Sequence, residues 1–264
     1  MKGLRIAMIV AVGTLLVAPR VYAQSTDAEF KCAASANKAG TKFVGSKSKC
    51  VQKCLAGAWK VNAGFGDCYP PYAGVTYECI VHNDLKPGKS AEEKFSAAIA
   101  KACDEVANPK LDCPECYKAS SGDCATYAVD RMLNIEGQVD TFVPGVGCEG
   151  AGATKEEQKC QTATAKALTK QVATLNKCYD KCIKNARKGL IPAASCSPPA
   201  TDLATSTCVG KGDTKTIAAI NKACLLDPAD CFAPNDYPDG ATWTNLVDGA
   251  ITGQIPGTYC EGDL

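Results

Sequence analysis

The chain has 264 residues, of which 29 are Lys or Arg and 28 are Asp or Glu, so its formal net charge is close to zero. A near-neutral total excludes binding to nucleic acid or membrane through overall charge alone. Leu, Ile, Val and Phe supply only 40 of the 241 residues that follow residue 23. That is too few for a hydrophobic core to hold the fold without covalent help.

The N-terminal segment has the composition of a secretory signal peptide. Lys2 and Arg5 precede an apolar run over residues 6–18, and Val21-Tyr22-Ala23 follows. A charged start, a short apolar centre and small residues before the cleavage point are the three parts of such a peptide. The apolar run is too short to span a bilayer comfortably. We therefore expect residues 1–23 to be removed and the mature chain to be secreted or periplasmic.

The chain contains 18 cysteines, all of them after residue 23. An even number of cysteines in an exported chain predicts disulfides, because compartments outside the cytosol are oxidising. Each bridge that closes a loop adds about 2 to 4 kcal/mol of stability by restricting the unfolded chain. About nine bridges are expected, formed by Cys32, Cys50, Cys54, Cys68, Cys79, Cys103, Cys113, Cys116, Cys124, Cys148, Cys160, Cys178, Cys182, Cys196, Cys208, Cys224, Cys231 and Cys260.

Two halves of the sequence resemble each other. With a shift of 128 residues, residues 31–68 align without a gap to residues 159–196, and 14 of the 38 positions are identical. Shorter matches follow in the same order toward the end of each half. A series of this kind predicts a duplicated unit. We divide the mature chain into one cysteine-rich helical unit at 24–150 and a second at 151–264.

Each unit is expected to begin with a long helix. In the second unit, Thr154 and Glu157 have the spacing of a capping box, and no Gly or Pro occurs from there to Lys188. This pattern predicts a helix of about 34 residues, some 50 Å long at the usual rise per residue. Thr26 and Glu29 have the same spacing at the start of the first unit.

A second, shorter helix is expected in each unit, antiparallel to the long one, over residues 91–107 and 214–226. The Gly- and Pro-rich stretches at 111–148 and 228–260 are typical of loops with little regular structure. The predicted fold class is therefore mainly α and disulfide-rich. It consists of two tandem copies of a unit with one long helix, one shorter antiparallel helix and long bridged loops.

The antiparallel arrangement predicts part of the disulfide pattern, because the end of each short helix then lies near the start of the long one. This reasoning pairs Cys32 with Cys103 and Cys160 with Cys224. The remaining pairs of the first unit are Cys50 and Cys54 with Cys68 and Cys79 in an order left open, Cys113 with Cys148, and Cys116 with Cys124 as an additional local bridge.

Lysines recur along one side of each long helix. At 100° per residue they lie opposite an apolar stripe that contains Leu168, Val172 and Leu175. A row of six cations along roughly 40 Å of helix suits an anionic polymer such as a surface polysaccharide or nucleic acid. The alternative is that the row is only the solvated face of an amphipathic helix. The two stripes consist of Lys31, Lys38, Lys42, Lys49, Lys53, Lys60, Lys159, Lys166, Lys170, Lys177, Lys181 and Lys188.

Three short motifs resemble chemical sites but favour structural roles. Cys113-Pro114-Glu115-Cys116 has redox spacing, yet it lacks the preceding strand and the long following helix of a thiol-disulfide exchange site. His82 is the only histidine, whereas zinc sites and hydrolytic triads usually need more imidazole or a matched base. Residues 235–240 lack the ligand pattern of an EF-hand and favour a turn. We expect no catalytic residue, no metal and no cofactor.

The sequence thus predicts an exported, noncatalytic structural or binding protein that is stabilised by about nine disulfides. One alternative is a polyanion-binding protein that uses the two lysine stripes. The other is a secreted enzyme or enzyme inhibitor. The partner stays open beyond an anionic polymer or a cell-surface component, and no transmembrane segment is expected in the mature chain.

Overall fold

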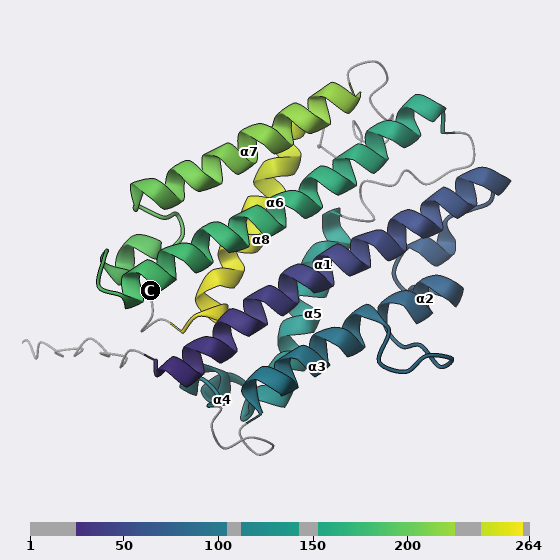
Figure 1. Cartoon of the computed structure of the whole chain (residues 1–264). Coiled ribbons are helices and arrows are strands. Elements are labelled where there is room, and N and C mark those ends of the chain that lie inside the picture. Colours follow the sequence, from purple (N-terminus) through teal and green to yellow (C-terminus); the bar gives the residue numbers. More distant parts are fainter. Residues whose placement is uncertain (1–24, 105–111, 143–152, 225–238, 261–264) are drawn as a thin grey trace, which may run out of the picture.

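The computed structural model describes residues 25–104, 112–142, 153–224 and 239–260, which contain α-helices, two short 3-10 helices and no strand (Figure 1). The prediction of a mainly helical, disulfide-rich fold is confirmed. The two longest helices are α1 (Asp27–Val61) and α6 (Lys155–Arg187). The other elements are η1 (Gly66–Cys68), α2 (Gly74–Ile80), α3 (Ala91–Cys103), α4 (Glu115–Ser121), α5 (Cys124–Phe142), η2 (Ala193–Cys196), α7 (Leu203–Cys224) and α8 (Gly240–Thr258).

The long helices start where the sequence predicts. The Thr26 hydroxyl accepts from the Glu29 backbone N–H at 3.2 Å, and the Thr154 hydroxyl accepts from the Glu157 N–H at 3.1 Å. In both cases the glutamate side chain accepts from the backbone N–H of the threonine, which completes a capping box. These bonds satisfy donors that the first turn of a helix leaves free.

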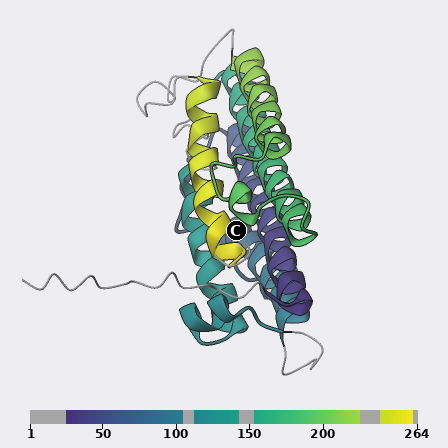
Figure 2. The same cartoon turned by 90° about the vertical axis from the view of Figure 1, so that its left-hand side faces the viewer.

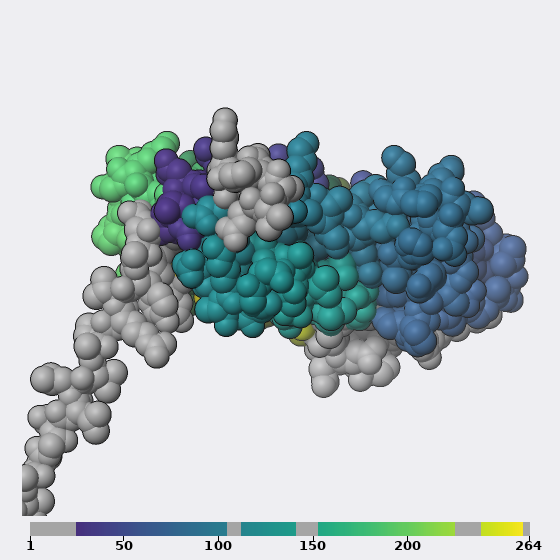
Figure 3. Space-filling view, turned by 90° about the horizontal axis from the view of Figure 1, so that it is seen from below, coloured from purple at the N-terminus to yellow at the C-terminus, as the bar shows by residue number. Residues whose placement is uncertain are grey.

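The helices form two layers. The helices α7, α6, α1 and α3 lie side by side in that order, and α8 and α5 lie behind them (Figures 1 and 2). The side chains of Asn176 and Thr41 and those of Thr169 and Ser48 are hydrogen-bonded, so α1 and α6 run antiparallel. Viewed from below in Figure 3, α5 lies along the edge of the molecule next to the segment that contains α2 and α3.

Both halves of the chain contribute to the same buried clusters. One cluster joins Val51 of α1 to Leu168 of α6 and Trp243 of α8. A second cluster joins Phe43 of α1 to Ile183 of α6, together with residues of α3 and α5. The apolar stripe that the sequence predicts on α6 is buried through Leu168, Val172, Leu175, Tyr179 and Ile183. The two long helices therefore pack into the same two buried clusters.

Eight disulfides join 16 of the cysteines. The predicted bridges Cys32–Cys103 and Cys160–Cys224 are confirmed. The order that the sequence leaves open is resolved, and it is the same in the two halves: Cys50–Cys79, Cys54–Cys68, Cys178–Cys208 and Cys182–Cys196. Cys148 and Cys231 lie outside the described residues.

Two predicted bridges were wrong. Cys113 pairs with Cys124 and not with Cys148, and Cys116 pairs with Cys260 and not with Cys124. The reason is that α5 begins at Cys124, which brings this residue to within 5.9 Å of Cys113 between Cα atoms. Cys116 in α4 is then close to the end of α8, at a Cα–Cα distance of 5.7 Å from Cys260.

The prediction of loops at 111–148 and 228–260 was also wrong, because α4 and α5 occupy most of the first stretch and α8 lies within the second. In α8, Trp243, Val247, Ile251 and Ile255 recur every fourth residue and are buried. Burying such side chains is worth about 1.5 to 3 kcal/mol each, which outweighs the cost of about 1 kcal/mol for each glycine in the helix. The shorter helices also differ from prediction, since α3 ends at Cys103 and α7 begins at Leu203.

Candidate binding face

All 12 lysines of the two predicted stripes are exposed. Within each stripe they are separated alternately by seven and four residues. Because seven residues make about two turns of an α-helix and four make about one, these positions return to the same side. The spacing therefore places one row of ammonium groups along one side of α1 and a second row along one side of α6.

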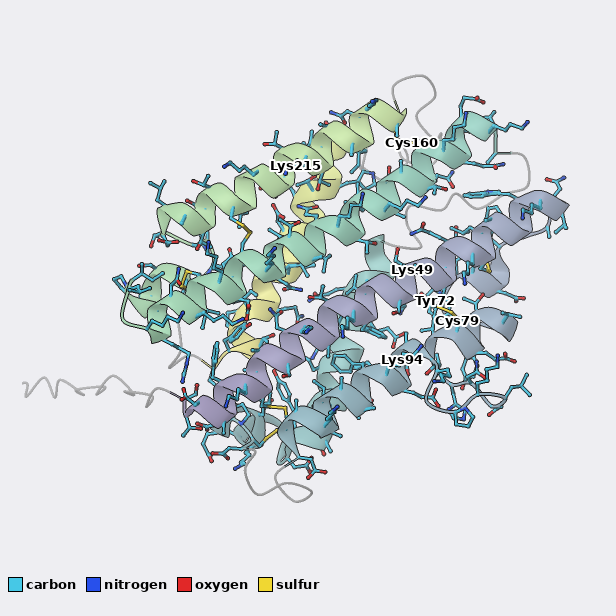
Figure 4. The ribbon with its side chains drawn as sticks, viewed as in Figure 1. Lys49, Tyr72, Cys79, Lys94, Cys160 and Lys215 are labelled. Atoms are coloured by element: carbon cyan, nitrogen blue, oxygen red, sulfur yellow. A yellow bond between two sulfur atoms is a disulfide. The ribbon has the colours of Figure 1, made fainter. Side chains whose placement is uncertain are left out.

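Both rows lie on the open side of the helix layer. The helix α1 packs against α3 and α6 at its sides and α5 behind it, and α6 packs against α1, α7 and α8. A helix that is covered in three directions exposes only the fourth, so its exposed lysines lie there. Figure 4 marks Lys215 on α7, Lys49 on α1 and Lys94 on α3, which are all helices of this layer.

We define the lysine face as the 12 stripe lysines together with Lys184, Lys211 and Lys215, which are also exposed. Lys211 and Lys215 belong to α7, where the sequence predicts a helix only from residue 214. Gly210 and Gly212 hide the true start of this helix from sequence inspection. The signal that could have found these lysines is their spacing of four residues, which places them on one side of a helix.

Few of these lysines have a carboxylate partner. Within the described residues, Lys159 lies 3.7 Å from Glu156, and the other 11 stripe lysines make no ion pair. Like charges four residues apart destabilise an isolated helix by about 0.2 to 0.5 kcal/mol per pair. The two stripes hold four such pairs: Lys38 and Lys42, Lys49 and Lys53, Lys166 and Lys170, and Lys177 and Lys181. Because so few carboxylates neutralise these lysines, their positive charge is available to bind an external anion.

A groove of about 1020 Å³ lies between α6 and α7. Lys166 and Lys170 of α6 and Lys211 and Lys215 of α7 are among its lining residues, and this lining contains no acidic residue. Most of the other lining residues are Ala or Thr. The two helices approach closely at Gly212, where a Cβ atom would lie 3.0 Å from the Thr174 methyl group.

A second groove of about 620 Å³ lies between α1 and α6. It is lined by five lysines of the lysine face and by one carboxylate, Asp180. That carboxylate accepts from Lys184 at 2.5 Å and from the Tyr259 hydroxyl at 2.9 Å, so it is already engaged. The lysines of this groove are Lys31, Lys38, Lys42, Lys177 and Lys184.

Lys47 also belongs to α1 but lies on its opposite, buried side. Its side chain is fully buried, with the ammonium nitrogen 2.6 Å from both Glu136 Oε1 and Asp140 Oδ1 of α5. The ammonium also lies 4.9 Å from the centre of the Tyr72 ring, and the Tyr72 hydroxyl donates to Asp140. Burial, assisted by the charge of Glu136, raises the pKa of nearby Glu92 to about 7. This cluster holds α1 against α5 and is not part of the lysine face.

The short motifs have structural partners. Cys113 and Cys116 bond to two different cysteines, so the motif lacks the internal disulfide that thiol exchange uses. The sulfurs of Cys32, Cys103 and Cys124 lie within 4.8 Å of one another, but all three are oxidised and offer no thiolate to a metal.

The two polar motifs likewise make local contacts. The half-exposed His82 ring lies 2.8 Å from Glu93 and 3.2 Å from Asp84. Asp239 accepts from the Thr242 N–H at 2.8 Å and caps α8. Residues 235–238 of the same predicted turn lie outside the described part of the chain.

None of the helices in the described part of the chain has both the length and the apolar composition that a membrane span requires. Searches against protein families, curated proteins and solved structures found no match to this chain. The lysine face is therefore interpreted from its own chemistry.

Proposed function

We propose that this protein is an exported, noncatalytic binding protein that holds an anionic polymer on its lysine face. The observation that carries this proposal is that 11 exposed stripe lysines without an ion pair lie on one open side of the helix layer. Cations in a fixed row release counterions when a polyanion binds, and this release favours the complex at low salt.

Export is supported by the composition of residues 1–23 and by the eight disulfides. Disulfides persist in oxidising compartments outside the cytosol. Three of them anchor each long helix to its neighbours, through Cys32, Cys50 and Cys54 on α1 and through their counterparts on α6. The bridges thus keep the lysine rows in place without a large apolar core.

We also infer that the face arose from a duplicated unit. Equivalent cysteines pair equivalently, with separations of 71 and 64, 29 and 30, and 14 and 14 residues. A third helix packs behind each pair, α5 against α1 and α3, and α8 against α6 and α7. Placing two copies side by side doubles the number of lysines on one surface.

The test is chromatography of the mature protein, residues 24–264, on an immobilised sulfated polysaccharide. Retention at low salt and elution in moderate salt are expected. A variant with Lys42, Lys49 and Lys53 changed to Gln should bind more weakly. The slope of log affinity against log salt should fall by about one for each lysine contact that is lost.

The matched control changes Lys86, Lys89 and Lys101 to Gln, which removes the same charge from exposed lysines outside the lysine face. This control should elute with the native protein. Absence of retention at low salt would overturn the proposal. Equal weakening by the control would also overturn it, because total charge and not the face would then account for binding.

A further inference from the structure

We propose that the groove between α6 and α7 is the subsite that binds one strand of an acidic polysaccharide, with anionic groups on four lysines and a sugar hydroxyl on Gln171. This inference rests on the proposed function and specifies where the polymer binds and what class it belongs to. Two independent observations support it: the positive charge of the groove lining, and the buried oxygen of Gln171, which has no hydrogen-bond donor among the described residues.

The charge of the lining is entirely positive. Lys166 and Lys170 are one turn apart on α6, and Lys211 and Lys215 are one turn apart on α7. Residues one turn apart have Cβ atoms about 5 to 6 Å from each other. Two lysine pairs on two helices that flank one groove can thus contact successive anionic groups of a strand that lies along it.

Gln171 supplies the second observation. It lines the groove, yet it is only 1% exposed, so it lies at the bottom. Its Nε2 lies 2.6 Å from Asp248 Oδ1, 3.2 Å from the Thr244 carbonyl oxygen and 3.3 Å from Asp213 Oδ1. These three acceptors fix the orientation of the amide, because only its nitrogen can donate to them.

With that orientation, Gln171 Oε1 is buried and has no hydrogen-bond partner among the described residues. Buried acceptors are nearly always paired in folded proteins, and an exception calls for a missing donor. A hydroxyl group of a bound sugar is such a donor. Polyphosphate carries no hydroxyl along its chain, so it could use the four lysines but would leave this acceptor unpaired.

The rest of the lining also favours a glycan over nucleic acid. The groove lining contains no arginine and no aromatic residue on which a base could stack, although stacking is a main source of affinity for single-stranded nucleic acids. Its Ala and Thr side chains are short, which leaves room for a sugar ring to approach α6 and α7 closely.

Among the described residues, the first half of the chain has no counterpart of the four-lysine arrangement, for a structural reason. α7 has 22 residues, whereas α3 has 13 and begins only at Ala91. Aligned on their final cysteines, Lys215 corresponds to Lys94, but Lys211 corresponds to Ser90, which caps α3. The additional turns of α7 therefore create the four-lysine arrangement in the second half.

The experiment uses the oxidised mature protein and isothermal titration at one low salt concentration. The first probe is a hexamer of galacturonic acid, which carries a carboxylate and free hydroxyls on each residue. The second probe is a linear polyphosphate of six phosphates. Lys211→Gln with Lys215→Gln should weaken binding of both probes at least tenfold. The matched control, Lys86→Gln with Lys89→Gln, removes two exposed lysines that lie outside the lysine face and do not line this groove, and it should weaken binding less than threefold.

Two further variants test the hydroxyl contact and the groove itself. Gln171→Met should weaken binding of the galacturonate hexamer at least fivefold and leave polyphosphate binding unchanged. Thr207→Trp fills the groove from an exposed position of α7 and leaves Gln171 unchanged, and it should abolish binding of the hexamer even if Gln171→Met fails to fold.

The outcomes separate this inference from the proposed function. If the variant with Lys211→Gln and Lys215→Gln and the variant Thr207→Trp both bound the hexamer as the native protein does, the assignment of the groove as the binding subsite would be overturned. Loss of column retention in the Lys42, Lys49 and Lys53 variant would still support the lysine face. Equal weakening of both probes by Gln171→Met would overturn the assignment to a glycan. Binding of neither probe by the native protein would overturn the inference and, together with absent column retention, the proposed function.

Discussion

At the scale of single residues, the same side chain has opposite roles on the two sides of one helix. Lys47 and Lys49 are two positions apart on α1, yet Lys47 is fully buried between two carboxylates and Lys49 is exposed. Residues two apart on a helix point in different directions. The buried lysine therefore acts on stability, and the exposed one is available for binding.

Replacing Lys47 by Met should destabilise the fold. The change leaves Glu136 and Asp140 without their cation, and breaking such a buried pair usually costs 3 to 5 kcal/mol. Because the two carboxylates keep 19% and 21% exposure, we expect a loss of about 2 to 4 kcal/mol. Urea unfolding measures this loss. Lys49→Met is the control and should stay within about 0.5 kcal/mol of the native protein; similar losses in both variants would contradict the buried cluster.

Glu92 should make stability depend on pH. Its pKa is raised from 4.5 to about 7 by burial and by the charge of Glu136. The folded state then binds the proton more tightly than the unfolded state, so the free energy of unfolding falls as pH rises from about 4.5 to 7. Glu92→Gln removes this loss and should stabilise the protein at pH 8 by about 1 to 2 kcal/mol, after allowance for partial exposure.

Urea midpoints at pH 5 and pH 8 test the Glu92 prediction. The variant should show a smaller difference between the two midpoints than the native protein does. A smaller slope of the same sign should remain, because burial also raises the pKa of Asp248 to about 6. An unchanged difference between the midpoints would show that Glu92 is not the group responsible.

At the scale of helices, the sequence predicts best those elements whose termini and faces carry clear signals. Thr26 and Thr154 mark the starts of α1 and α6, and the apolar stripe of α6 marks its buried side. In contrast, α8 contains Pro256 and several glycines, so its composition indicates a loop. Packing against α6 and α7 stabilises this helix, and such tertiary contacts cannot be read from local composition.

Two glycines of α8 provide a test of its packing. A Cβ atom at Gly240 would lie 2.8 Å from Asn221 Oδ1 and 2.9 Å from the Ile217 carbonyl oxygen, whereas at Gly249 nothing lies within 4 Å. Gly240→Ala should therefore cost about 1 to 3 kcal/mol by overpacking. Gly249→Ala should stabilise the protein by up to about 1 kcal/mol, because alanine favours a helix.

Thermal unfolding of the two glycine variants measures the difference. The prediction is a lower melting temperature for Gly240→Ala and an unchanged or higher one for Gly249→Ala. If both variants melted above the native protein, the close contact between the start of α8 and α7 would be wrong.

At the scale of the whole molecule, the arrangement of helices turns two lysine stripes into one face. The sequence predicts each stripe from its spacing, but it does not predict that α1 and α6 lie side by side or that α7 extends to Leu203. Those features depend on contacts between distant segments. For the same reason, Lys211 and Lys215 and the bridge Cys116–Cys260, which spans 144 residues, were missed.

The measurement that tests the central claim most directly compares two forms of the mature protein that carry the same charge. One form is oxidised, and the other is reduced and blocked with iodoacetamide, which adds no charge. Affinity for a sulfated polysaccharide is measured at low salt for both. If the disulfide-held arrangement of lysines binds the polymer, the reduced form should bind at least tenfold more weakly. Equal affinity of the two forms would contradict the account, because the lysines would then bind as a flexible polycation without need of the fold.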